Sequence, residues 1–562
     1  MKRFNDIIYI LSAALILSAC ATTQSISTGQ SSSEPDIPFK ARDFYLEGLY
    51  LQMEERYNEA LVQFYQALLY DSTSSTIYNS IAENHIRLGH FDSALILLEK
   101  SRQLDPKNEE TISLLAETYY HLKEDLKAIN AYRSLLDIDP YNDRARQFLL
   151  FMYQKNDMEE ALTAQYQEIL KLYGREKDNL FRLAKLYEKQ DDLEKARYYY
   201  KQILQIDSLD LHARYELGNI ADEAGQTREA LRYYKEALEQ DSLFRPAALK
   251  LNRFYRQEQS WPKIIELFQP FLQADSTDLE VRLLMAEAYY FQDSYQQAKQ
   301  LLDMMLNEDE VYWGVYDLLG RVEFELKNYE TARGYFRKVV DEKPENKFSW
   351  LFLGFTYSDE NRYAEAEKVY RRALKEIPDD VMLWAFLGIA LQEQDKNAEA
   401  VSPLKKALQL DEKHMNALSS LAVVYENLQQ YARADSIYEQ AIGHYPNNPL
   451  LLNNYSYSLC ERDTRLQEAL QMSKKAVEQE PDNAAYLDTI GWIYYKLGEL
   501  QKAEQYIKKA VQLTPESAVL LEHLGFVYYA MNNMEEAVRY WQRALQLDGN
   551  NTNLKQKLET IE

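Results

Sequence analysis

Side chains that could carry out catalysis or bind a metal ion are few and far apart in this sequence. The 562 residues include seven histidines and two cysteines. His85 and His90 are the closest pair of histidines, but they are five positions apart. Two ligands on one helix face are four positions apart. The acidic pairs Glu109-Glu110 and Asp379-Asp380 are explained by helix starts, where the helix dipole stabilises negative charge. The spacing therefore indicates no metal site.

Motifs that hold phosphates, activate a nucleophile or bind zinc are absent from the sequence, which contains no G-x-G-x-x-G, G-x-x-x-x-G-K-S/T, G-x-S-x-G or H-E-x-x-H. Cys20 and Cys460 are too few for a disulfide framework, and we expect Cys460 to be a buried, inert thiol. With 64 Lys and Arg against 89 Asp and Glu, the net charge of −25 repels nucleic-acid phosphates. We therefore expect no enzyme activity, no cofactor and no nucleic-acid partner.

The N-terminus has the features of a secretory signal. Lys2 and Arg3 precede an apolar stretch from Ile7 to Leu17, which would span about 16 Å as a helix and is too short for a bilayer core of about 30 Å. Leu17-Ser18-Ala19-Cys20 resembles the bacterial lipobox, in which the cysteine becomes the lipidated N-terminus of the mature protein. The alternative is an ordinary signal peptide that contains Cys20 by chance.

This resemblance implies a signal peptide at 1–19 and a lipid-anchored tether at 20–40. The tether is rich in Ser, Thr and Gln, a composition that predicts a flexible segment. Two or three acyl chains on Cys20 would hold the protein stably at a membrane. Ala21 is not the aspartate that retains some lipoproteins in the inner membrane. We therefore expect an outer-membrane lipoprotein of the bacterial cell envelope that faces the periplasm.

The rest of the chain repeats a pattern of 34 residues. In the copy from Lys347 to Asp380 the pattern is Trp350-x2-Leu353-Gly354-x2-Tyr357, then Ala366-x3-Tyr370-x2-Ala373, then Pro378. This pattern resembles the tetratricopeptide repeat, a pair of helices. Alanines keep the 34-residue interval or twice that interval, and resume it after one inserted residue, at Ala60, Ala94, Ala128, Ala196, Ala230, Ala298, Ala332, Ala366, Ala400, Ala434, Ala469, Ala503 and Ala537.

The resemblance covers residues 41–551 as fifteen consecutive copies, numbered one to fifteen below. It implies an all-α fold, a right-handed superhelical α-solenoid of about fifteen helix pairs in which each copy packs only against its neighbours. The 16 glycines and 45 tyrosines are typical of long helices with aromatic packing. The apolar spacing in 552–562 predicts a C-terminal capping helix.

Small residues at the eighth position of a copy, such as Gly354, are expected to let its first helix (helix A) approach its second (helix B). The alanine at the twentieth position, Ala366 in the same copy, is expected to supply the matching small surface. Large residues at the twenty-fourth position, such as Tyr370, are expected to fill the space between neighbouring copies.

Two copies depart from this pattern. Copy four (143–176) displaces its alanine, and Leu162 stands at the twentieth position. Copy seven (245–278) has Ile264 at that position and Pro270 inside helix B, where a kink is expected. Copy seven could therefore be a joint between two segments of the solenoid, or a tolerated irregularity.

Helix A of copy seven also carries a basic stripe, Lys250, Arg253 and Arg256, in an acidic chain. The stripe is either a solvated helix face or a surface that meets an acidic partner.

Copy thirteen (449–483) contains the inserted residue, near Glu461 to Arg465. Three stretches in and after this copy are Asn453-Asn454-Tyr455-Ser456-Tyr457-Ser458-Leu459, Arg465-Leu466-Gln467-Glu468-Ala469 and Leu487-Asp488-Thr489-Ile490-Gly491-Trp492. Together they resemble a segment of bacterial tetratricopeptide lipoproteins, including those that partner envelope carboxyl-terminal processing proteases. The resemblance implies an envelope protein that binds other proteins.

In tetratricopeptide repeats, positions 2, 5, 6, 9, 12 and 13 of helix A line the concave face. An exposed apolar surface of this kind usually marks a binding site, although the rings could instead pack against the neighbouring copy. Copies eight to eleven and thirteen to fifteen hold aromatic residues at these positions, namely Tyr290, Phe291, Phe324, Phe348, Phe352, Phe355, Phe386, Tyr457, Trp492, Tyr495, Phe526 and Tyr529.

These features predict a non-enzymatic, lipid-anchored scaffold or adaptor that binds proteins or peptides, with a protease adaptor or envelope-assembly adaptor as the first hypothesis. The alternative is a binding module of a polysaccharide-export or peptidoglycan machinery, in which the aromatic residues would stack on sugars. The sequence pattern specifies neither the partner nor the oligomeric state.

Overall fold

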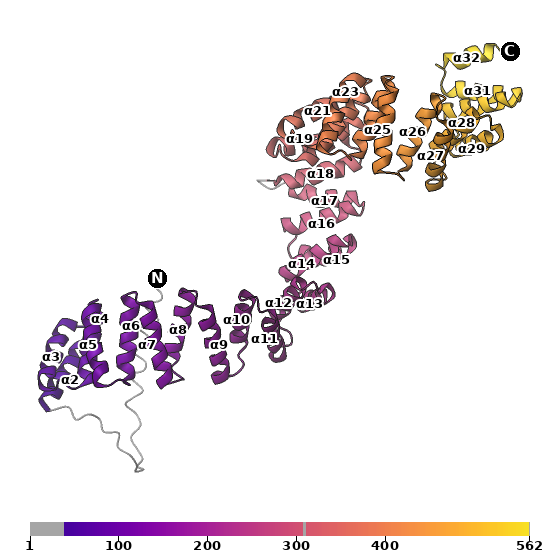
Figure 1. The fold of residues 1–562 in the computed structure, drawn as a ribbon. Coiled ribbons are helices and arrows are strands. Elements are labelled where there is room, and N and C mark those ends of the chain that lie inside the picture. Colours follow the sequence, from indigo (N-terminus) through magenta and orange to yellow (C-terminus); the bar gives the residue numbers. More distant parts are fainter. Residues whose placement is uncertain (1–38, 307–310, 561–562) are drawn as a thin grey trace. The chain divides into compact units, whose positions relative to one another are not determined.

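The structure, a computed structural model, describes residues 39–306 and 311–560 (Figure 1). Every regular element in these ranges is an α-helix, and there are 31 helices. Thirty of them form fifteen pairs, and each pair corresponds to one copy of the repeat. The predicted all-α stack of fifteen helix pairs is therefore confirmed.

The helices of copies one to six are α2 (Phe39–Met53), α3 (Tyr57–Tyr70), α4 (Ser75–Arg87), α5 (Phe91–Leu104), α6 (Glu109–His121), α7 (Asp125–Ile138), α8 (Asp143–Lys155), α9 (Glu159–Tyr173), α10 (Lys177–Lys189), α11 (Leu193–Ile206), α12 (Leu211–Glu223) and α13 (Thr227–Gln240). Those of copies seven to eleven are α14 (Arg245–Gln257), α15 (Trp261–Ala274), α16 (Leu279–Phe291), α17 (Tyr295–Met305), α18 (Trp313–Glu325), α19 (Tyr329–Glu342), α20 (Lys347–Ser358), α21 (Tyr363–Glu376), α22 (Val381–Gln392) and α23 (Asn397–Leu410). The remainder are α24 (Met415–Asn427), α25 (Tyr431–His444), α26 (Pro449–Glu461), α27 (Leu466–Gln479), α28 (Ala484–Lys496), α29 (Leu500–Leu513), α30 (Ala518–Ala530), α31 (Met534–Leu547) and α32 (Thr552–Glu559).

The chain divides into two compact units, residues 1–247 (unit 1) and 248–562 (unit 2). The boundary falls inside α14, the first helix of copy seven. Within each unit a helix packs mainly against the helices that precede and follow it in sequence. Pro270 lies inside α15, which continues to Ala274. The predicted joint at copy seven stays a prediction.

Most copies begin with a side-chain cap on helix A. The last residue of the preceding copy is usually Asn, Asp or Ser, and its side chain accepts a hydrogen bond from a backbone N–H in the first turn. Asn142 Oδ1 accepts from the Ala145 N–H at 3.0 Å, and Asp210 Oδ1 accepts from the Ala213 N–H at 2.8 Å. These caps explain why helix A starts at the same place in successive copies.

The turn between helix A and helix B has a left-handed residue at position 15 of every copy. Gly89, Gly225 and Gly498 supply it in three copies. The other copies use Asp, Asn, Gln, Lys or Glu, for example Lys327 with φ 61° and Asn361 with φ 57°. This turn would tolerate glycine in all fifteen copies, so the low glycine content is not a requirement of the fold.

The small residue at the eighth position leaves room for a large side chain of helix B. A Cβ on Gly354 would lie 2.3 Å from Cε1 of Tyr370, and a Cβ on Gly320 would lie 2.6 Å from Cε1 of Phe336. The side chain over each glycine is thus that of the twenty-fourth position in the same copy. The position-24 side chain therefore reaches across to helix A and fills the space that the small residue leaves.

The ends of the solenoid differ slightly from their predicted bounds. Helix α2 begins at Phe39, two residues before the predicted start of copy one. At the other end, α32 is the predicted capping helix and buries Leu554 and Leu558. The signal peptide at 1–19 and all but the last two residues of the tether lie outside the described residues. No helix within the described ranges is both long and apolar enough to cross a membrane.

Candidate partner-binding surfaces

Four of the predicted groove residues form a continuous line of rings across copies nine to eleven, which we call the aromatic row: Phe324, Phe352, Phe355 and Phe386. The ring centroids of Phe324 and Phe352 are 5.5 Å apart, those of Phe352 and Phe355 are 5.9 Å apart, and those of Phe355 and Phe386 are 4.7 Å apart. All three contacts are edge-to-face, a favourable geometry for aromatic pairs. The structure therefore brings together residues that the sequence placed in separate copies.

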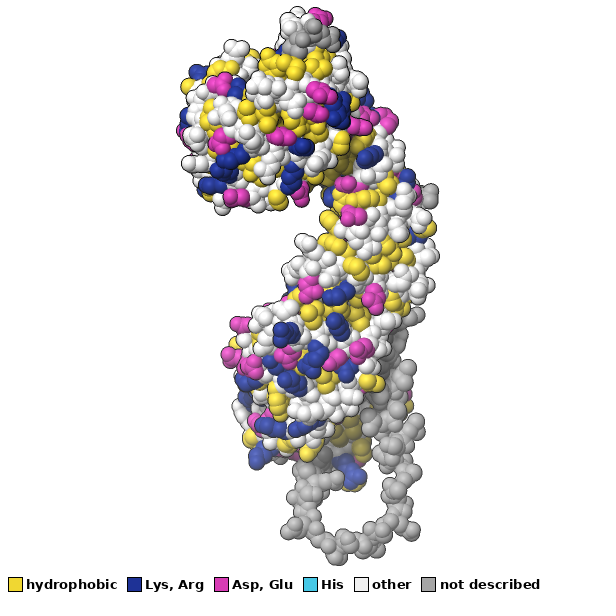
Figure 2. Space-filling view, turned by 90° about the vertical axis from the view of Figure 1, so that its right-hand side faces the viewer, with side chains coloured by type: hydrophobic (Ala, Val, Ile, Leu, Met, Phe, Trp, Pro, Cys, Tyr) yellow, Lys and Arg dark blue, Asp and Glu magenta, His cyan; other side chains and the backbone are white. Residues whose placement is uncertain are grey.

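The aromatic row is half-buried because buried rings support it from below. Phe336 stacks on Phe352 with centroids 5.7 Å apart, and Tyr370 stacks on Phe386 at 6.2 Å. Both supporting rings are position-24 side chains that lie over a glycine of their own copy. The row is therefore part of the core as well as part of the surface. In unit 2, hydrophobic side chains form contiguous surface areas with charged side chains between them (Figure 2).

Three other predicted groove residues belong to copies eight and ten. Phe348 is 53% exposed, with Lys347 Nζ 5.3 Å from its ring. Phe291 is 46% exposed and stacks on Trp261 with centroids 4.6 Å apart. Tyr290 is half-buried, and burial raises the pKa of its hydroxyl. Among these three rings, Phe348 and Phe291 are thus the more available to a partner.

Trp492 was predicted to face a partner, and the structure corrects this. Its side chain is only 9% exposed, because its ring is stacked between Tyr495 at 4.5 Å and His523 at 4.1 Å. Its indole N–H donates to Glu461 Oε1 at 2.8 Å, and His523 Nδ1 lies 2.9 Å from Asp488 Oδ1. The alternative considered for such rings, packing between copies, applies to Trp492.

The last two predicted groove residues lie beneath the capping helix. Lys557 Nζ of α32 lies 4.7 Å from the ring of Phe526, 4.8 Å from that of Tyr529 and 5.6 Å from that of Trp541. Tyr529 keeps 38% of its surface exposed. The cap therefore occupies part of the surface that a partner would need at this end.

The inserted residue of copy thirteen creates a second left-handed position, at Arg465. The Arg465 guanidinium donates to the Tyr455 hydroxyl at 2.7 Å and to Glu439 at 3.0 Å. Cys460 in the preceding helix is fully buried, as predicted, and burial raises the pKa of its thiol to about 12. Much of the motif that resembles bacterial lipoproteins therefore holds helices together, while Tyr457 remains 39% exposed.

The basic stripe of copy seven is only partly directed at solvent. Arg256 forms an ion pair with Glu287 of α16, and the Arg253 guanidinium lies 5.0 Å from the ring of Phe254. Lys250 and Arg253 both make further interactions within the chain. At least Arg256 therefore stabilises the packing of copy seven on copy eight.

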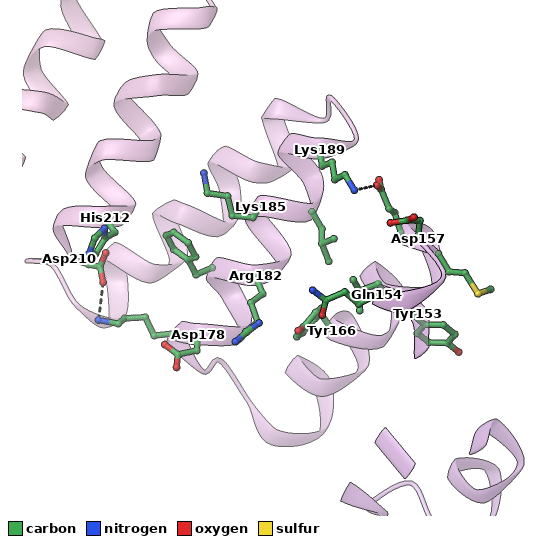
Figure 3. Close-up of a pocket in the computed structure, with 16 residues that line it drawn as sticks. Tyr153, Gln154, Asp157, Tyr166, Asp178, Arg182, Lys185, Lys189, Asp210 and His212 are labelled. Carbon is green, nitrogen blue, oxygen red and sulfur yellow. Dashed lines mark ion pairs between the residues drawn. The ribbon is translucent and has the colours of Figure 1, made fainter. Parts of the chain in front are cut away.

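A pocket of about 760 Å³ in unit 1 was not predicted; we call it the copy-four pocket (Figure 3). Its walls come from α8, α9, α10 and the start of α12. The side chains along α10 include Asp178, Phe181, Arg182, Lys185 and Lys189, at positions 2, 5, 6, 9 and 13 of copy five. The inner positions of helix A that carry aromatic residues in unit 2 thus carry mostly charged residues here, and the sequence pattern contained this signal.

The copy-four pocket opens where the repeat lacks its small residues. Leu150 occupies the eighth position of copy four and Leu162 the twentieth, and both side chains are half-buried between the helices. Two leucines in place of glycine or alanine hold the helix axes apart, and α8 and α9 pack less closely than the helix pairs of copies three and five. The space next to α10 is therefore left open.

The lysines at the two ends of α10 are paired with carboxylates of copy five and copy four. Lys177 Nζ lies 2.8 Å from Asp210 and 3.1 Å from Asp207, and these hydrogen bonds raise the pKa of Lys177 above its ordinary value. Lys189 is paired with Glu159, which likewise raises the pKa of Lys189. Lys189 therefore ties copy five to copy four, and Lys177 ties α10 to the residues just before α12.

Within the described ranges, no group of three or more His, Cys, Asp or Glu side chains could hold a metal ion. His85 and His90 have ring centroids 5.8 Å apart. The Tyr65 hydroxyl lies 3.1 Å from Nε2 of His85. The two rings therefore meet beside an aromatic hydroxyl.

Seven segments of the chain match models of the tetratricopeptide repeat: 178–207, 211–242, 255–316, 323–388, 417–450, 484–517 and 518–551. The chain is built from tetratricopeptide repeats. The last two segments have the same bounds as copies fourteen and fifteen, so the repeat register derived from the alanine spacing agrees with the family model there.

Two curated proteins show local similarity to this repeat protein. It is 34% identical over 86 residues to the TPR repeat-containing protein PA4667 of Pseudomonas aeruginosa. The matched stretch covers 15% of each chain. It is 36% identical over 93 residues to sperm-associated antigen 1 of Rattus norvegicus. That stretch covers 16% of this chain and 10% of that protein. The matched stretch therefore spans a small part of either relative.

Two solved structures have a similar arrangement of helices. The Naa15/Naa10 complex bound to HypK-THB gives 14% identity and a TM-score of 0.39, with 93% of this chain and 96% of that chain covered. A tetratricopeptide repeat protein from Parabacteroides merdae gives 16% identity and a TM-score of 0.37, with 44% of this chain and 97% of that chain covered.

Proposed function

We propose that this protein is a non-enzymatic scaffold or adaptor of the bacterial cell envelope, which binds partner proteins along the inner positions of its helix A series. The observation that carries the proposal is the aromatic row together with the exposed Phe348 of copy ten, because a contiguous apolar surface of this kind favours association with another protein. Repeats of this family stack into extended binding surfaces, which supports the same function.

We place the scaffold at the outer membrane through a lipid on Cys20. The support is Leu17-Ser18-Ala19-Cys20 and the polar tether that follows. A Cys20→Ser variant should lose incorporation of radiolabelled palmitate and move from the membrane fraction to the soluble fraction. An Ala21→Ser variant serves as the control for a neighbouring change. Equal membrane association of Cys20→Ser and the unmodified protein would contradict the anchor.

Among envelope partners, a carboxyl-terminal processing protease or an envelope-assembly factor is our first candidate. The basis is the copy-thirteen segment, whose resemblance to protease-partner lipoproteins covers about 50 residues. A peptidoglycan or polysaccharide machinery is the second candidate, since exposed rings such as Phe348 and Tyr457 could stack on sugars.

A photo-crosslinking experiment separates these candidates. The exposed Phe348 is replaced by p-benzoylphenylalanine, because replacing the half-buried rings of the aromatic row would also damage the core. We expect a crosslink to a protease or an assembly factor, identified by mass spectrometry. The same substitution at Tyr198, an equally exposed ring on α11, is the control. Retention of purified glycan strands without a protein crosslink would instead favour the second candidate, and hydrolytic activity of the purified protein would contradict both.

A further inference from the structure

The copy-four pocket lies along inner positions of helix A in copy five and is distinct from the aromatic row in unit 2. We propose that this pocket binds a segment of a partner protein in which an apolar side chain lies close to an acidic side chain. The proposal rests on the proposed function as a protein-binding scaffold, and it adds the chemistry of one partner segment.

The inner wall of the pocket is apolar. Leu162 and Tyr166 of α9 face Phe181 and Leu186 of α10, and Met158 lies at the turn before α9. These side chains are half-buried or buried, and the pocket volume is within the range of about 300–1,000 Å³ that ligand sites usually have. An apolar side chain that enters here would cover these surfaces. Each Å² of apolar surface removed from water favours binding by about 25 cal/mol.

Three of the four cations along α10 are already engaged by carboxylates of this chain. Lys177 is held by Asp207 and Asp210, and Lys189 by Glu159. Lys185 Nζ lies 2.8 Å from Glu188 and 2.7 Å from Glu216. These lysines are therefore neutralised before any partner arrives.

Arg182 is the remaining cation, and it is exposed. In the described part of the chain, its guanidinium has neither an ion pair nor a hydrogen bond. In Figure 3 its side chain lies between Asp178 on one side and Gln154 and Tyr166 on the other, at the apolar wall. A guanidinium binds a carboxylate through two parallel hydrogen bonds, which makes an acidic side chain the matching group.

The nearby carboxylates do not reverse this preference for an acid. Asp178 stands in the first turn of α10, where the helix dipole stabilises its charge. Asp157 lies in the turn before α9, on the opposite side of the pocket from Asp178 (Figure 3). Together with Glu159 and Asp210 they disfavour a polyanion such as nucleic acid, while a single carboxylate next to an apolar group can reach Arg182.

Capped, fluorescein-labelled nonapeptides test the proposal by fluorescence anisotropy with the full-length chain. Each acidic probe carries one Leu or Phe, and one Glu placed one, two or three residues after it, in a Gly/Ser background. Matched probes replace the Glu by Lys, or the apolar residue by Ala. We expect at least one acidic probe to bind at least tenfold more tightly than both of its matched probes, and to weaken as salt rises.

Three variants then locate the binding. Arg182→Glu and Gln154→Trp, both at exposed positions, should each weaken the acidic probe at least tenfold. Arg182→Glu should at the same time improve binding of the matched Lys probe. Arg228→Glu on α13 makes the same charge change away from the pocket and should leave binding unchanged. Circular dichroism confirms that each variant is folded.

Equal binding of acidic and Lys probes, or an equal loss in Arg182→Glu and Arg228→Glu, would overturn the proposal. An acidic probe that binds only when it is made without its C-terminal cap would also overturn it, since the acid would then be the terminal carboxylate and not a side chain. If every probe fails while Phe348 still crosslinks to a protein partner, the pocket proposal is wrong and the scaffold stands. If both fail, the scaffold proposal fails with it.

Discussion

The ring of Tyr370 occupies the space that a side chain on Gly354 would need, because a Cβ there would lie 2.3 Å from Cε1 of that ring. We expect Gly354→Ala to destabilise copy ten. The overpacking costs about 1–3 kcal/mol, which exceeds the gain of about 1 kcal/mol from replacing glycine inside a helix. The measurement is the free energy of local unfolding, from hydrogen exchange of amides in α20 and α21.

Gly334 provides the matched control for this variant. It also lies inside a helix, α19, but a Cβ there would meet nothing within 4 Å. Gly334→Ala should therefore stabilise the protein by about 0.5–1 kcal/mol. If both glycine variants changed stability in the same direction, the close approach of Tyr370 would not be what requires glycine in copy ten.

Glu426 gives the protein a pH dependence. Burial raises the pKa of its carboxyl to about 7 from an ordinary 4.5, and the Tyr438 hydroxyl, which donates to Oε2 at 3.1 Å, only partly opposes this. The neutral carboxyl is thus favoured by the fold. The resulting stabilisation is complete below about pH 4.5 and is lost as the pH rises through about 7.

We therefore expect Glu426→Gln to be more stable than the unmodified protein at pH 8, by about 2 kcal/mol, and to differ little from it at pH 5. Thermal unfolding of both proteins between pH 5 and pH 8 measures this difference. Glu239→Gln, at an exposed position on α13, is the control and should leave the pH profile unchanged. A Glu426→Gln profile parallel to that of the unmodified protein would mean that this carboxyl ionises normally.

Residue positions were predicted from the sequence more reliably than residue exposure. The 34-residue spacing placed Phe352, Phe355 and Phe386 on one surface because the repeat fixes which side of helix A a position faces. It could not show that Trp492 is covered, since that depends on His523, one copy later, and on its pairing with Asp488. Exposure is set by the side chain of the next copy, which the pattern does not specify.

At the scale of the element, the turn between helices A and B holds a left-handed residue at a fixed position, and most copies fill it with a residue other than glycine. Lys327 has φ 61° and is exposed. A left-handed conformation costs a residue with a Cβ about 1–2 kcal/mol, whereas glycine loses about 0.5–1 kcal/mol of chain entropy. Lys327→Gly should therefore stabilise copy nine by about 0.5–1 kcal/mol, as measured by thermal unfolding.

The reverse change tests the same turn in copy fourteen. Gly498 has φ +78°, and a Cβ there would meet nothing within 4 Å. Any loss of stability in Gly498→Ala would therefore come from the backbone alone, and we expect about 1 kcal/mol. A stable Gly498→Ala variant together with an unchanged Lys327→Gly variant would show that this turn carries no strain.

The helices and their bounds were largely predictable because caps and turns recur with the repeat, but the copy-four pocket was not. The displaced alanine of copy four was visible in the sequence, as was Leu162. Two large side chains can separate a helix pair. Whether a pocket then remains depends on whether the neighbouring helices shift to fill the space, which the sequence pattern does not specify. Here Leu150 and Leu162 leave a pocket open beside α10.

At the scale of the molecule, a repeat protein is stabilised mainly by contacts between neighbouring copies, so a change at one end should act locally. The capping helix α32 offers a direct test. It buries Leu554 and Leu558 and places Lys557 over the rings of Phe526 and Tyr529. Burial of two leucines contributes about 3–6 kcal/mol, most of which copy fifteen alone would lose.

We expect deletion of 552–562 to increase hydrogen exchange strongly in copy fifteen, less in copy fourteen, and not in copies one to six. Leu554→Ser with Leu558→Ser should reproduce most of this effect, because it removes the apolar contact although the chain keeps its full length. Lys557→Gln should have a smaller effect, since a half-buried cation over aromatic rings contributes about 0.5–2 kcal/mol. Faster exchange spread evenly over both units would mean that the copies unfold together, and the nearest-neighbour description of this solenoid would then be wrong.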